Sequence, residues 1–476
     1  MNDIYLGLDL ATAGARLIAV ADDGTVMAQA SAPLPAPTSP SPGHMQQAAT
    51  CLRVSESLLR RVTTTLGDSA EAIRAMCITG TSGTVVPCDA AGRPTGPALL
   101  YNDQRATDEV YRLQEAGYDA GATSSLARIG WLRTHTPAAR YLFTPDVVAA
   151  GLLGRVPPTD TSHALKAGID AVTAQWNDSA LAILGMDRTS LPELVHPGAP
   201  LGQVTADAAG RTGLRSRVRL YAGMTDGCTA QIGAGAVSPG ETVGVLGTTL
   251  VLKAVAEIPV SGYRGAVYSH YAPDGRFWPG GASNVGSGLI REEFMGENLD
   301  QLGAAAERSG PADAVRYPLP RVGERFPFNR PDAEGFLVGR ADTVVERYRT
   351  LLEGVAFTER LGLEALASLG VETVTHRVVG GGSRSRAWNR IRATVLGKPV
   401  IRPERASSGY GAAALAAAAH TDSTLADVTK RLMPDAEVIE PDVSQAGRLD
   451  DNYERLCEEL RRRGYLQVGA RTEEAT

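Results

Sequence analysis

The stretch IYLGLDLATAGARLIAV at residues 4–20 has the pattern of an apolar strand, a turn of small residues and a second apolar strand. The stretch VGVLGTTLVLKAV at residues 243–255 repeats this pattern. Small residues let the backbone of such a turn come close to a ligand, and its successive N–H groups favour an anion. Two hairpins of this kind, one in each half of the chain, predict a nucleotide clamped between two related domains.

Each turn also carries a glycine and a threonine hydroxyl. The first turn has Thr12 and Gly14, and the second has Gly247 and Thr248. Asp9 ends the strand before the first turn, where a carboxylate can hold Mg²⁺ directly or through water. The alternative is that Asp9 only caps the turn. The second copy of the pattern favours the metal-related role.

A second carboxylate also lies at the end of a predicted strand. The stretch VRLYAGMTD (218–226) predicts a strand that delivers Asp226 to the first turn of a small-residue helix at 227–237. A helix N-terminus favours the anionic form of such a group. A carboxylate there can accept a proton from a substrate hydroxyl. The alternative is an aspartate that only caps the helix.

Two polar turns bracket a predicted hairpin, GTSGT (80–84) and YNDQR (101–105). Ser82, Asn102 and Asp103 would offer a hydroxyl, an amide and a carboxylate from one edge. This set suits a polyhydroxylated ligand, because each hydroxyl needs a partner once water is excluded. The alternative is ordinary turn chemistry, which favours the same residue types.

The glycine run Gly380–Gly382 follows an apolar strand and opens a predicted helix. Glycines at such a turn let a flat ring or a phosphate approach the backbone. The run does not match GxGxxG, and the sequence contains no GxxxxGK[ST]. Rossmann and P-loop interpretations therefore lose support.

Composition excludes several classes of protein. The chain has 476 residues, of which 43% are hydrophobic and 21% charged, and its net charge of -6 gives no basic field for nucleic acid or an anionic membrane. No apolar run is long enough to span a bilayer. The five cysteines include no C-x-x-C pair, and the seven histidines show no ligand spacing. We expect a cytoplasmic protein without a disulfide framework, in which the histidines are not catalytic.

Strands that alternate with helices predict an α/β protein of two domains. We expect an N-terminal domain over residues 1–235, joined by a C-terminal helix within 440–476, and a second domain over 236–439. We expect residues 261–334, rich in glycine and proline, to be irregular, and residues 342–369 to form a long amphipathic helix.

Taken together, these motifs resemble the FGGY carbohydrate kinases, members of the actin/hexokinase/Hsp70 superfamily. The resemblance runs nearly end to end, through six segments in the family's order. They are GLDLATAGAR, then GTSGT with CDAAGRPTGPALLYNDQR, GMTDGCTAQIGAGAVSPGETVGVLGTT, GGASNVGSGL, GGGSRSRAWNRIRATVLGKPV and SSGYGAAALAA.

The resemblance implies two actin-like (ribonuclease H-like) domains with ATP, Mg²⁺ and a sugar in a central cleft. It makes Asp226 the general base, and it places Asp9, Ser82, Asp103 and Asp226 at the sugar. Asp9 would also hold Mg²⁺, possibly through water. The residues that it places along ATP are Thr12, Gly14, Gly247, Thr248, Gly281, Gly381, Gly382 and Ser385.

The acceptor is harder to infer. Xylulose kinases usually carry a glutamine–histidine pair, and glycerol kinases an arginine–glutamate pair, where this chain has GTSGT. The motifs look more like those of the small D-ribulose kinases, so we expect D-ribulose, with D-xylulose, L-ribulose or a tetritol as alternatives. The family's Gly–Thr–(Ser/Thr) turn is Ala11–Thr12–Ala13 here, which leaves a nucleotide-binding regulatory pseudokinase as a second alternative. A homodimer is one state in which the chain could act.

Overall fold

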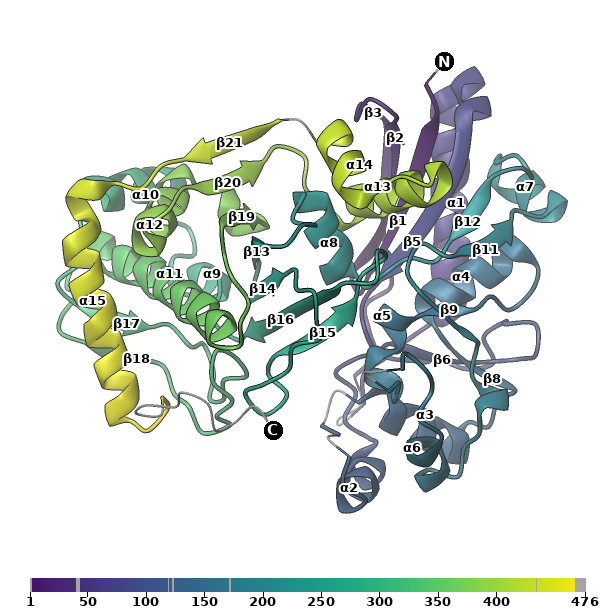
Figure 1. Ribbon diagram of the computed structural model, residues 1–476, viewed down its shortest axis with the longest axis horizontal. Helices are drawn as coiled ribbons and strands as arrows, with labels where there is room; N and C mark the ends of the chain where they lie inside the picture. Colours follow the sequence, from purple (N-terminus) through teal and green to yellow (C-terminus); the bar gives the residue numbers. More distant parts are fainter. Residues whose placement is uncertain are drawn as a thin grey trace. The chain divides into compact units, whose positions relative to one another are not determined.

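The computed structural model describes residues 2–39, 43–118, 120–121, 124–170, 173–433 and 435–466. The chain divides into two compact units, each described here by itself (Figure 1). Unit 1 comprises Met1–Gly235, His270–Gly275 and Ser407–Pro434, and unit 2 comprises Ala236–Ser269, Arg276–Ala406 and Asp435–Thr476.

Unit 1 is built on a six-stranded sheet with the order β11-β12-β5-β1-β2-β3. A smaller sheet, β4-β7-β6-β8, lies in the same unit. The strands are β1 (Ile4–Ala11), β2 (Gly14–Ala21), β3 (Val26–Pro33), β4 (Met45–Gln46), β5 (Ile73–Gly80), β6 (Val85–Cys88), β7 (Ala98–Leu99), β8 (Arg140–Phe143), β9 (Thr159–Asp160), β10 (Leu194–Val195), β11 (Pro200–Gln203) and β12 (Arg219–Tyr221). The helices are α1 (Ala48–Leu66), α2 (Thr107–Glu115), α3 (Ser125–His135), α4 (Thr144–Leu153), α5 (Thr161–Ala164), α6 (Asp178–Ile183), α7 (Ala206–Thr212), α8 (Asp226–Ala234), α13 (Ser408–Thr421) and α14 (Leu425–Leu432).

The predicted hairpin at residues 4–20 is confirmed as β1 and β2, which pair antiparallel from Ile4–Ala21 to Ala11–Gly14. On its other side β1 pairs parallel with β5, and β5 pairs parallel with β12. Strand β1 is buried along nearly its whole length: α13 packs on β1 and β5, and α1 packs on the neighbouring β2 and β3.

Helix α13 approaches β1 more closely than side chains would allow. A methyl group on Gly7 would lie 1.8 Å from the carbonyl oxygen of Gly409, and one on Gly411 would lie 1.8 Å from that of Thr229 in α8. Glycine is therefore required where α13 crosses the strand and the neighbouring helix. Figure 1 shows α13 beside β1 and α8, although it comes near the end of the chain.

Unit 2 contains a seven-stranded sheet with the order β15-β16-β14-β13-β19-β20-β21. Its strands are β13 (Glu241–Leu246), β14 (Leu250–Ala254), β15 (Tyr268–Tyr271, which ends in unit 1), β16 (Phe277–Ser283), β17 (Val315–Tyr317), β18 (Phe336–Val338), β19 (Thr375–Val379), β20 (Val400–Pro403) and β21 (Ala436–Ile439). Its helices are α9 (Gly288–Glu293), α10 (Leu299–Arg308), α11 (Val344–Ser368), α12 (Arg386–Leu396) and α15 (Val443–Arg462).

The two sheets share a plan. In unit 1 an antiparallel trio, β3-β2-β1, is followed by β5 and β12, which run parallel to β1. In unit 2 the trio β16-β14-β13 is followed by β19 and β20 in the same way. The repeat of architecture that the two hairpin sequences predicted is therefore confirmed.

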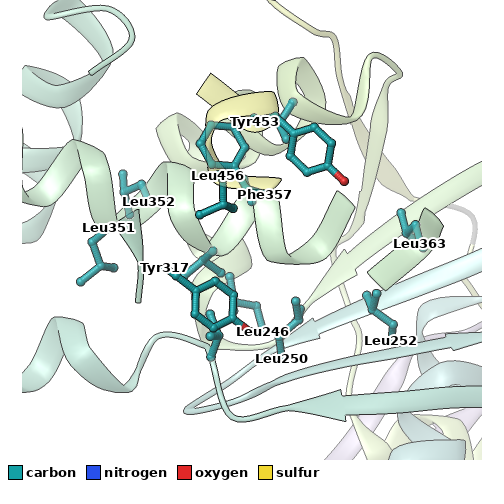
Figure 2. Close-up of a cluster of buried hydrophobic side chains, with 14 of the residues drawn as sticks. Leu246, Leu250, Leu252, Tyr317, Leu351, Leu352, Phe357, Leu363, Tyr453 and Leu456 are labelled. Atoms are coloured by element: carbon teal, nitrogen blue, oxygen red, sulfur yellow. The ribbon is translucent and has the colours of Figure 1, made fainter. Parts of the chain in front are cut away.

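The C-terminal helix belongs to a different unit from the one that we expected. Residues 440–476 were expected to join the N-terminal domain, but α15 packs on α12 and β17 of unit 2. Figure 2 shows Tyr453 and Leu456 of α15 beside Phe357, and the rings of Phe357 and Tyr453 have centroids 6.0 Å apart. The segment that returns to unit 1 is instead 407–434, because its glycines fit against β1. Residues 467–476 lie outside the described part.

A second expectation also needs correction. Residues 261–334 were expected to be irregular, but they contain β15, β16, α9, α10 and β17. The glycines and prolines of this segment lie largely in the short connections, while Phe277–Ser283 pairs with β14. The helix expected at 342–369 is confirmed as α11, which begins with a capping box between Thr343 and Glu346.

Gly7→Ala should destabilise the protein by about 3 kcal/mol or more, because the new methyl group would collide with the backbone of α13. Urea unfolding midpoints measure this effect. Gly447→Ala is the control, since a methyl group there meets nothing within 4 Å in helix α15; it should be neutral or stabilise by up to about 1 kcal/mol. Equal midpoints for the two variants would contradict the packing argument.

Candidate active site

In unit 1, three parallel strands end side by side and bring the predicted polar residues to one edge. Asp9 of β1 pairs with Thr79 of β5, and the Thr81 N–H donates to the Leu10 carbonyl. An isolated parallel bridge joins Gly80 to Thr225. Ligands of such sheets bind outside the carboxyl ends of the strands. The structure therefore brings Asp9, Ser82 and Asp226 to the edge where a ligand is expected.

Asp9 is a buried carboxylate that is poorly compensated. It is 5% exposed, and among the described residues its Oδ1 has no hydrogen-bond partner. Burial, and next the charge of Asp226, raise the pKa of Asp9 to about 6, while Arg16 opposes the rise. Arg16 lies opposite Asp9 in the β1–β2 register. The sequence motifs did not single out this arginine. The hairpin predicted at residues 4–20 could have indicated it, because pairing Ala11 with Gly14 sets Arg16 opposite Asp9.

Asp226 is the first residue of α8 and is held by the backbone around it. Its Oδ1 accepts the Gly227 N–H at 2.7 Å. The Thr79 hydroxyl donates to the Met224 carbonyl at 2.7 Å and lies 2.9 Å from the Thr229 hydroxyl, which ties β5 to the start of α8. The start of α8 is thus tied to β5, and the Gly227 N–H holds one oxygen of the carboxylate.

Ser82 lies in the turn after β5, and its hydroxyl oxygen is buried without a partner among the described residues. The turn is held by Arg128 of α3, which donates to the Gly83 carbonyl at 2.9 Å and to the Tyr101 carbonyl at 3.1 Å. Burial lowers the pKa of Arg128 to about 10, against the effect of Asp103, so the group stays charged at neutral pH. Arg128 therefore joins the two polar turns that the sequence had singled out.

Asp103 differs from Ser82 because its carboxylate is already engaged. It pairs with Arg105 at 2.8 Å, and it accepts the His44 N–H at 2.8 Å and the Arg105 N–H at 3.1 Å. Its side chain is fully shielded from solvent. In this structure Asp103 anchors the 101–105 turn, and its oxygens are not presented at the strand edge.

The β1–β2 turn keeps its shape through contacts from outside the hairpin. The Gln46 amide donates to the Thr12 carbonyl at 2.9 Å, and the Leu34 N–H donates to the Ala13 carbonyl at 3.1 Å. A methyl group on Gly14 would lie 2.9 Å from the Ala32 carbonyl oxygen. Beside this hairpin lies a cavity of about 410 Å³, whose lining includes Asp9, Arg16, Gln29, Arg61 and Ser407.

In unit 2 the equivalent turn joins β13 to β14. The Gly247 N–H donates to the Thr249 carbonyl, and Thr248 is exposed. The Ser287 hydroxyl donates to the Gly247 carbonyl at 2.6 Å, and the Gly288 N–H donates to the Thr248 carbonyl at 3.2 Å. The start of α9 therefore holds this turn in place.

The remaining unit 2 positions fall into two kinds. A methyl group on Gly281 would lie 2.5 Å from the Phe326 ring, and one on Gly382 would lie 2.5 Å from Leu246. Both glycines are thus explained by packing. Gly381, in contrast, is exposed and has nothing within 4 Å of a methyl group. The Ser385 hydroxyl caps α12 by accepting the Trp388 N–H at 3.2 Å.

A buried glutamate orders the loop after Gly281. Glu324 accepts the hydroxyls of Ser283 and Tyr317 at 2.8 and 2.7 Å, and the Asn284 N–H at 2.7 Å. Nothing in the sequence had marked this residue, because its partners come from two separate segments.

Histidines that the sequence left without partners have them in the fold. His163 lies 2.6 Å from Asp160 and 3.3 Å from the Gly80 carbonyl oxygen, so it supports the end of β5. His376, in β19 of unit 2, lies 3.0 Å from Glu359.

Comparison with known proteins identifies the family. Residues 4–233 match the N-terminal domain of the FGGY family of carbohydrate kinases, and residues 242–420 match its C-terminal domain. The chain belongs to the FGGY family of carbohydrate kinases. It is therefore a phosphotransferase with an alcohol group as acceptor, and the two-domain α/β fold that its motifs predicted is the fold of this family.

Individual relatives of this FGGY protein act on different acceptors. The xylulose kinase of Escherichia coli is 26% identical over 91% of this chain and 95% of its own length. The glycerol kinase of Delftia acidovorans is 27% identical over 86% of this chain and 89% of its own. The crystal structure of xylulose kinase from Rhodospirillum rubrum has a TM-score of 0.85 and 27% identity, and covers 96% of this chain and 98% of that one.

The residues of this FGGY chain fit a hydrated Mg²⁺ better than a metal bound by protein alone. The partnerless Oδ1 of Asp9 is a hard oxygen acceptor of the kind that Mg²⁺ or a water on it prefers. Among the described residues no group of three His, Cys, Asp or Glu side chains is arranged to hold a metal.

In the same part of the chain, no helix combines the length and the hydropathy needed to cross a bilayer.

Asp9→Asn should raise the stability of this FGGY protein at pH 8. The folded-state pKa of Asp9, about 6, lies above its ordinary value of 3.8, so the ionised form destabilises the fold above pH 6 and the penalty disappears as the pH falls towards 4. The variant should gain on the order of 1–3 kcal/mol at pH 8, and less at pH 4.5. Thermal unfolding at both pH values measures this gain, and a variant less stable than wild type at pH 8 would contradict it.

Proposed function

We propose that this FGGY protein transfers the γ-phosphoryl group of ATP to a primary hydroxyl of a small ketose, with Asp226 as general base. The supporting observation is the edge in unit 1, where Asp9, Ser82 and Asp226 lie at or after the ends of three adjacent parallel strands. Family membership supports phosphoryl transfer to an alcohol.

Asp226 would accept the hydroxyl proton as the sugar oxygen attacks the γ-phosphorus. A bond forms between that oxygen and phosphorus, the bond from phosphorus to the β–γ bridging oxygen breaks, and ADP leaves with the electron pair. Most of the acceleration in phosphoryl transfer comes from positioning and electrostatics. The Gly227 N–H fixes one carboxylate oxygen of Asp226, which supplies part of that positioning.

For ATP we propose the two hairpin turns and the open glycine. Thr12 and Gly14 in unit 1, and Gly247 and Thr248 in unit 2, would contact phosphates through backbone N–H and hydroxyl groups. Gly381 would lie along the adenosine, because its exposed backbone leaves room for a flat ring. Gly281, Gly382 and Ser385 would shape that surface through their packing and capping contacts.

The metal proposal rests on Asp9. Asp9 would hold Mg²⁺ through a water molecule, and Arg16 would balance the charge of the phosphates beside it. When bound, Mg²⁺ neutralises charge on the phosphate oxygens. The preference of Asp9 for a positive partner follows from its burial and from the neighbouring charge of Asp226.

D-Ribulose is our first acceptor and D-xylulose our second. The Ser82 hydroxyl supports the first, since it is buried, lacks a protein partner among the described residues, and stands where xylulose kinases usually have glutamine and histidine. The relatives named xylulose kinase favour the second. We place Ser82 in direct contact with the sugar. Asp103 would act through the turn that it anchors, because both of its oxygens are engaged.

Asp226→Asn should lower kcat by about 10²-fold or more, because the amide cannot accept the hydroxyl proton. ATP binding should be unchanged, since the amide keeps the size of the side chain. Asp207→Asn, an exposed carboxylate on α7, is the matched control and should keep wild-type turnover. ADP release under saturating ATP and sugar measures both, and near-normal turnover of Asp226→Asn would remove it as the base.

A panel of D-ribulose, D-xylulose, L-ribulose, tetritols and glycerol, followed by ADP release, tests the acceptor. D-Ribulose should give the highest kcat/KM. Ser82→Ala should lower that value about 2- to 10-fold, because one hydrogen bond to the sugar is lost, and should change glycerol turnover less. A higher kcat/KM with D-xylulose would overturn the D-ribulose assignment and keep the reaction. No ADP release with any acceptor would overturn the proposed function.

A further inference from the structure

The turn that delivers Asp226 is held by a buried serine from a distant part of the chain. Ser162, in α5, is fully buried, and its hydroxyl oxygen accepts the Thr225 N–H at 3.2 Å. The same oxygen lies 3.2 Å from the Thr225 hydroxyl and 3.1 Å from Nδ1 of His270. His270 belongs to the segment His270–Gly275, which packs in unit 1. The Ser162 hydroxyl also donates to Cys228 Sγ at 3.7 Å, so four groups converge on it beside the turn that carries Asp226.

Thr225 occupies the N-cap position of α8 but does not cap the helix through its side chain. Its φ and ψ of -61° and 153° are those of an ordinary N-cap. An N-cap threonine usually accepts an N–H of the second or third helical residue, here Gly227 or Cys228. In this structure the Thr225 hydroxyl makes no such bond. It points instead to Ser162, and the Gly227 N–H donates to the Asp226 carboxylate.

The two arrangements compete for the same donor. A Thr225 hydroxyl released from Ser162 could rotate to accept the Gly227 N–H, because its backbone already has the capping conformation. The Asp226 carboxylate would then lose the contact that fixes its Oδ1. The choice between these arrangements sets the position of the catalytic carboxylate.

We infer that Ser162 is a positioning residue, which holds the Thr225 hydroxyl away from the α8 N-terminus so that the Gly227 N–H is left for Asp226. This inference deepens the proposed function and rests on Asp226 as its base. His270 completes this hydrogen-bonded arrangement. The Ser162 oxygen accepts the Thr225 N–H, and the same hydroxyl lies 3.1 Å from His270 Nδ1 and 3.7 Å from Cys228 Sγ, so these two side chains help to hold it against Thr225.

Three variants test the inference. Ser162→Ala should lower kcat about 10-fold with little change in the KM for ATP, because the freed Thr225 hydroxyl displaces Asp226. Thr225→Val should change kcat less than about 3-fold, since valine keeps the shape and removes the competing hydroxyl. The double variant Ser162→Ala/Thr225→Val should recover to within about 3-fold of wild type, because no hydroxyl remains to compete.

The rescue separates positioning from a purely structural role. If Ser162 only stabilised the fold, loss of a second buried hydroxyl would lower activity further, so a double variant as slow as Ser162→Ala overturns the inference. Ser55→Ala is the matched control: it removes another fully buried serine hydroxyl of unit 1, which donates to the Cys51 carbonyl within α1. It should keep wild-type kcat.

A crystal structure of Ser162→Ala provides a readout that needs no turnover. We expect the Thr225 hydroxyl to lie within hydrogen-bond distance of the Gly227 or Cys228 N–H. An unchanged Thr225 side chain would overturn the inference whatever the activity. Wild-type protein that phosphorylates no acceptor in the panel would overturn the proposed function alone, since the Thr225 rotation would still be seen.

Discussion

The parallel pairing of β5 with both β1 and β12 is the constraint on which the candidate site depends. Because side chains alternate along each strand and the register is fixed by backbone hydrogen bonds, one residue of slip would turn Asp9 away from its edge. Helix α13 covers this part of the sheet at a distance that Gly7 allows, since a methyl group on Gly7 would lie 1.8 Å from the Gly409 carbonyl oxygen. The close contact between α13, near the end of the chain, and β1 thus supports the strand that carries Asp9.

The edge created by this pairing carries groups that a stable fold would avoid. Asp9 is buried beside another carboxylate, and the Ser82 hydroxyl is buried without a partner among the described residues. Two other buried carboxylates of the same unit have partners: Asp103 has Arg105, and Asp160 has His163. A carboxylate that is buried beside a second carboxylate and has a raised pKa is typical of functional sites, so Asp9 supports the candidate site. In unit 2, Gly381 differs from Gly281 and Gly382. The surroundings of Gly381 are open, whereas side chains pack closely against the other two glycines.

Much of the fold follows from the pattern of the sequence. The two hairpins, the strand before Asp226, the glycine run after β19 and the long helix α11 lie where their residues predicted them, because alternation, glycine turns and capping boxes are local signals. The irregular interpretation of 261–334 was wrong because short strands and helices interrupted by proline and glycine give weak local patterns. The prediction that the last helix packs on the N-terminal domain was wrong. An amphipathic pattern shows that one face of a helix is buried, but it does not show which element that face contacts. Arg128, Ser162, His270 and Glu324 were missed for a related reason, since each acts through contacts with residues distant in sequence.

The sequence by itself determined the family, the repeated architecture and the identities of the carboxylates and turns, because these depend on residue types at fixed local spacings. Only the tertiary structure decided that α15 completes unit 2 while α13 returns to unit 1, that both Asp103 oxygens are engaged, and that Ser162 and His270 meet behind Asp226. These outcomes depend on contacts between residues far apart in the chain, 59 residues for Asp103 and His44 and 108 for Ser162 and His270. Pairing of that kind is settled by the packing of whole elements, and a local pattern carries no record of it.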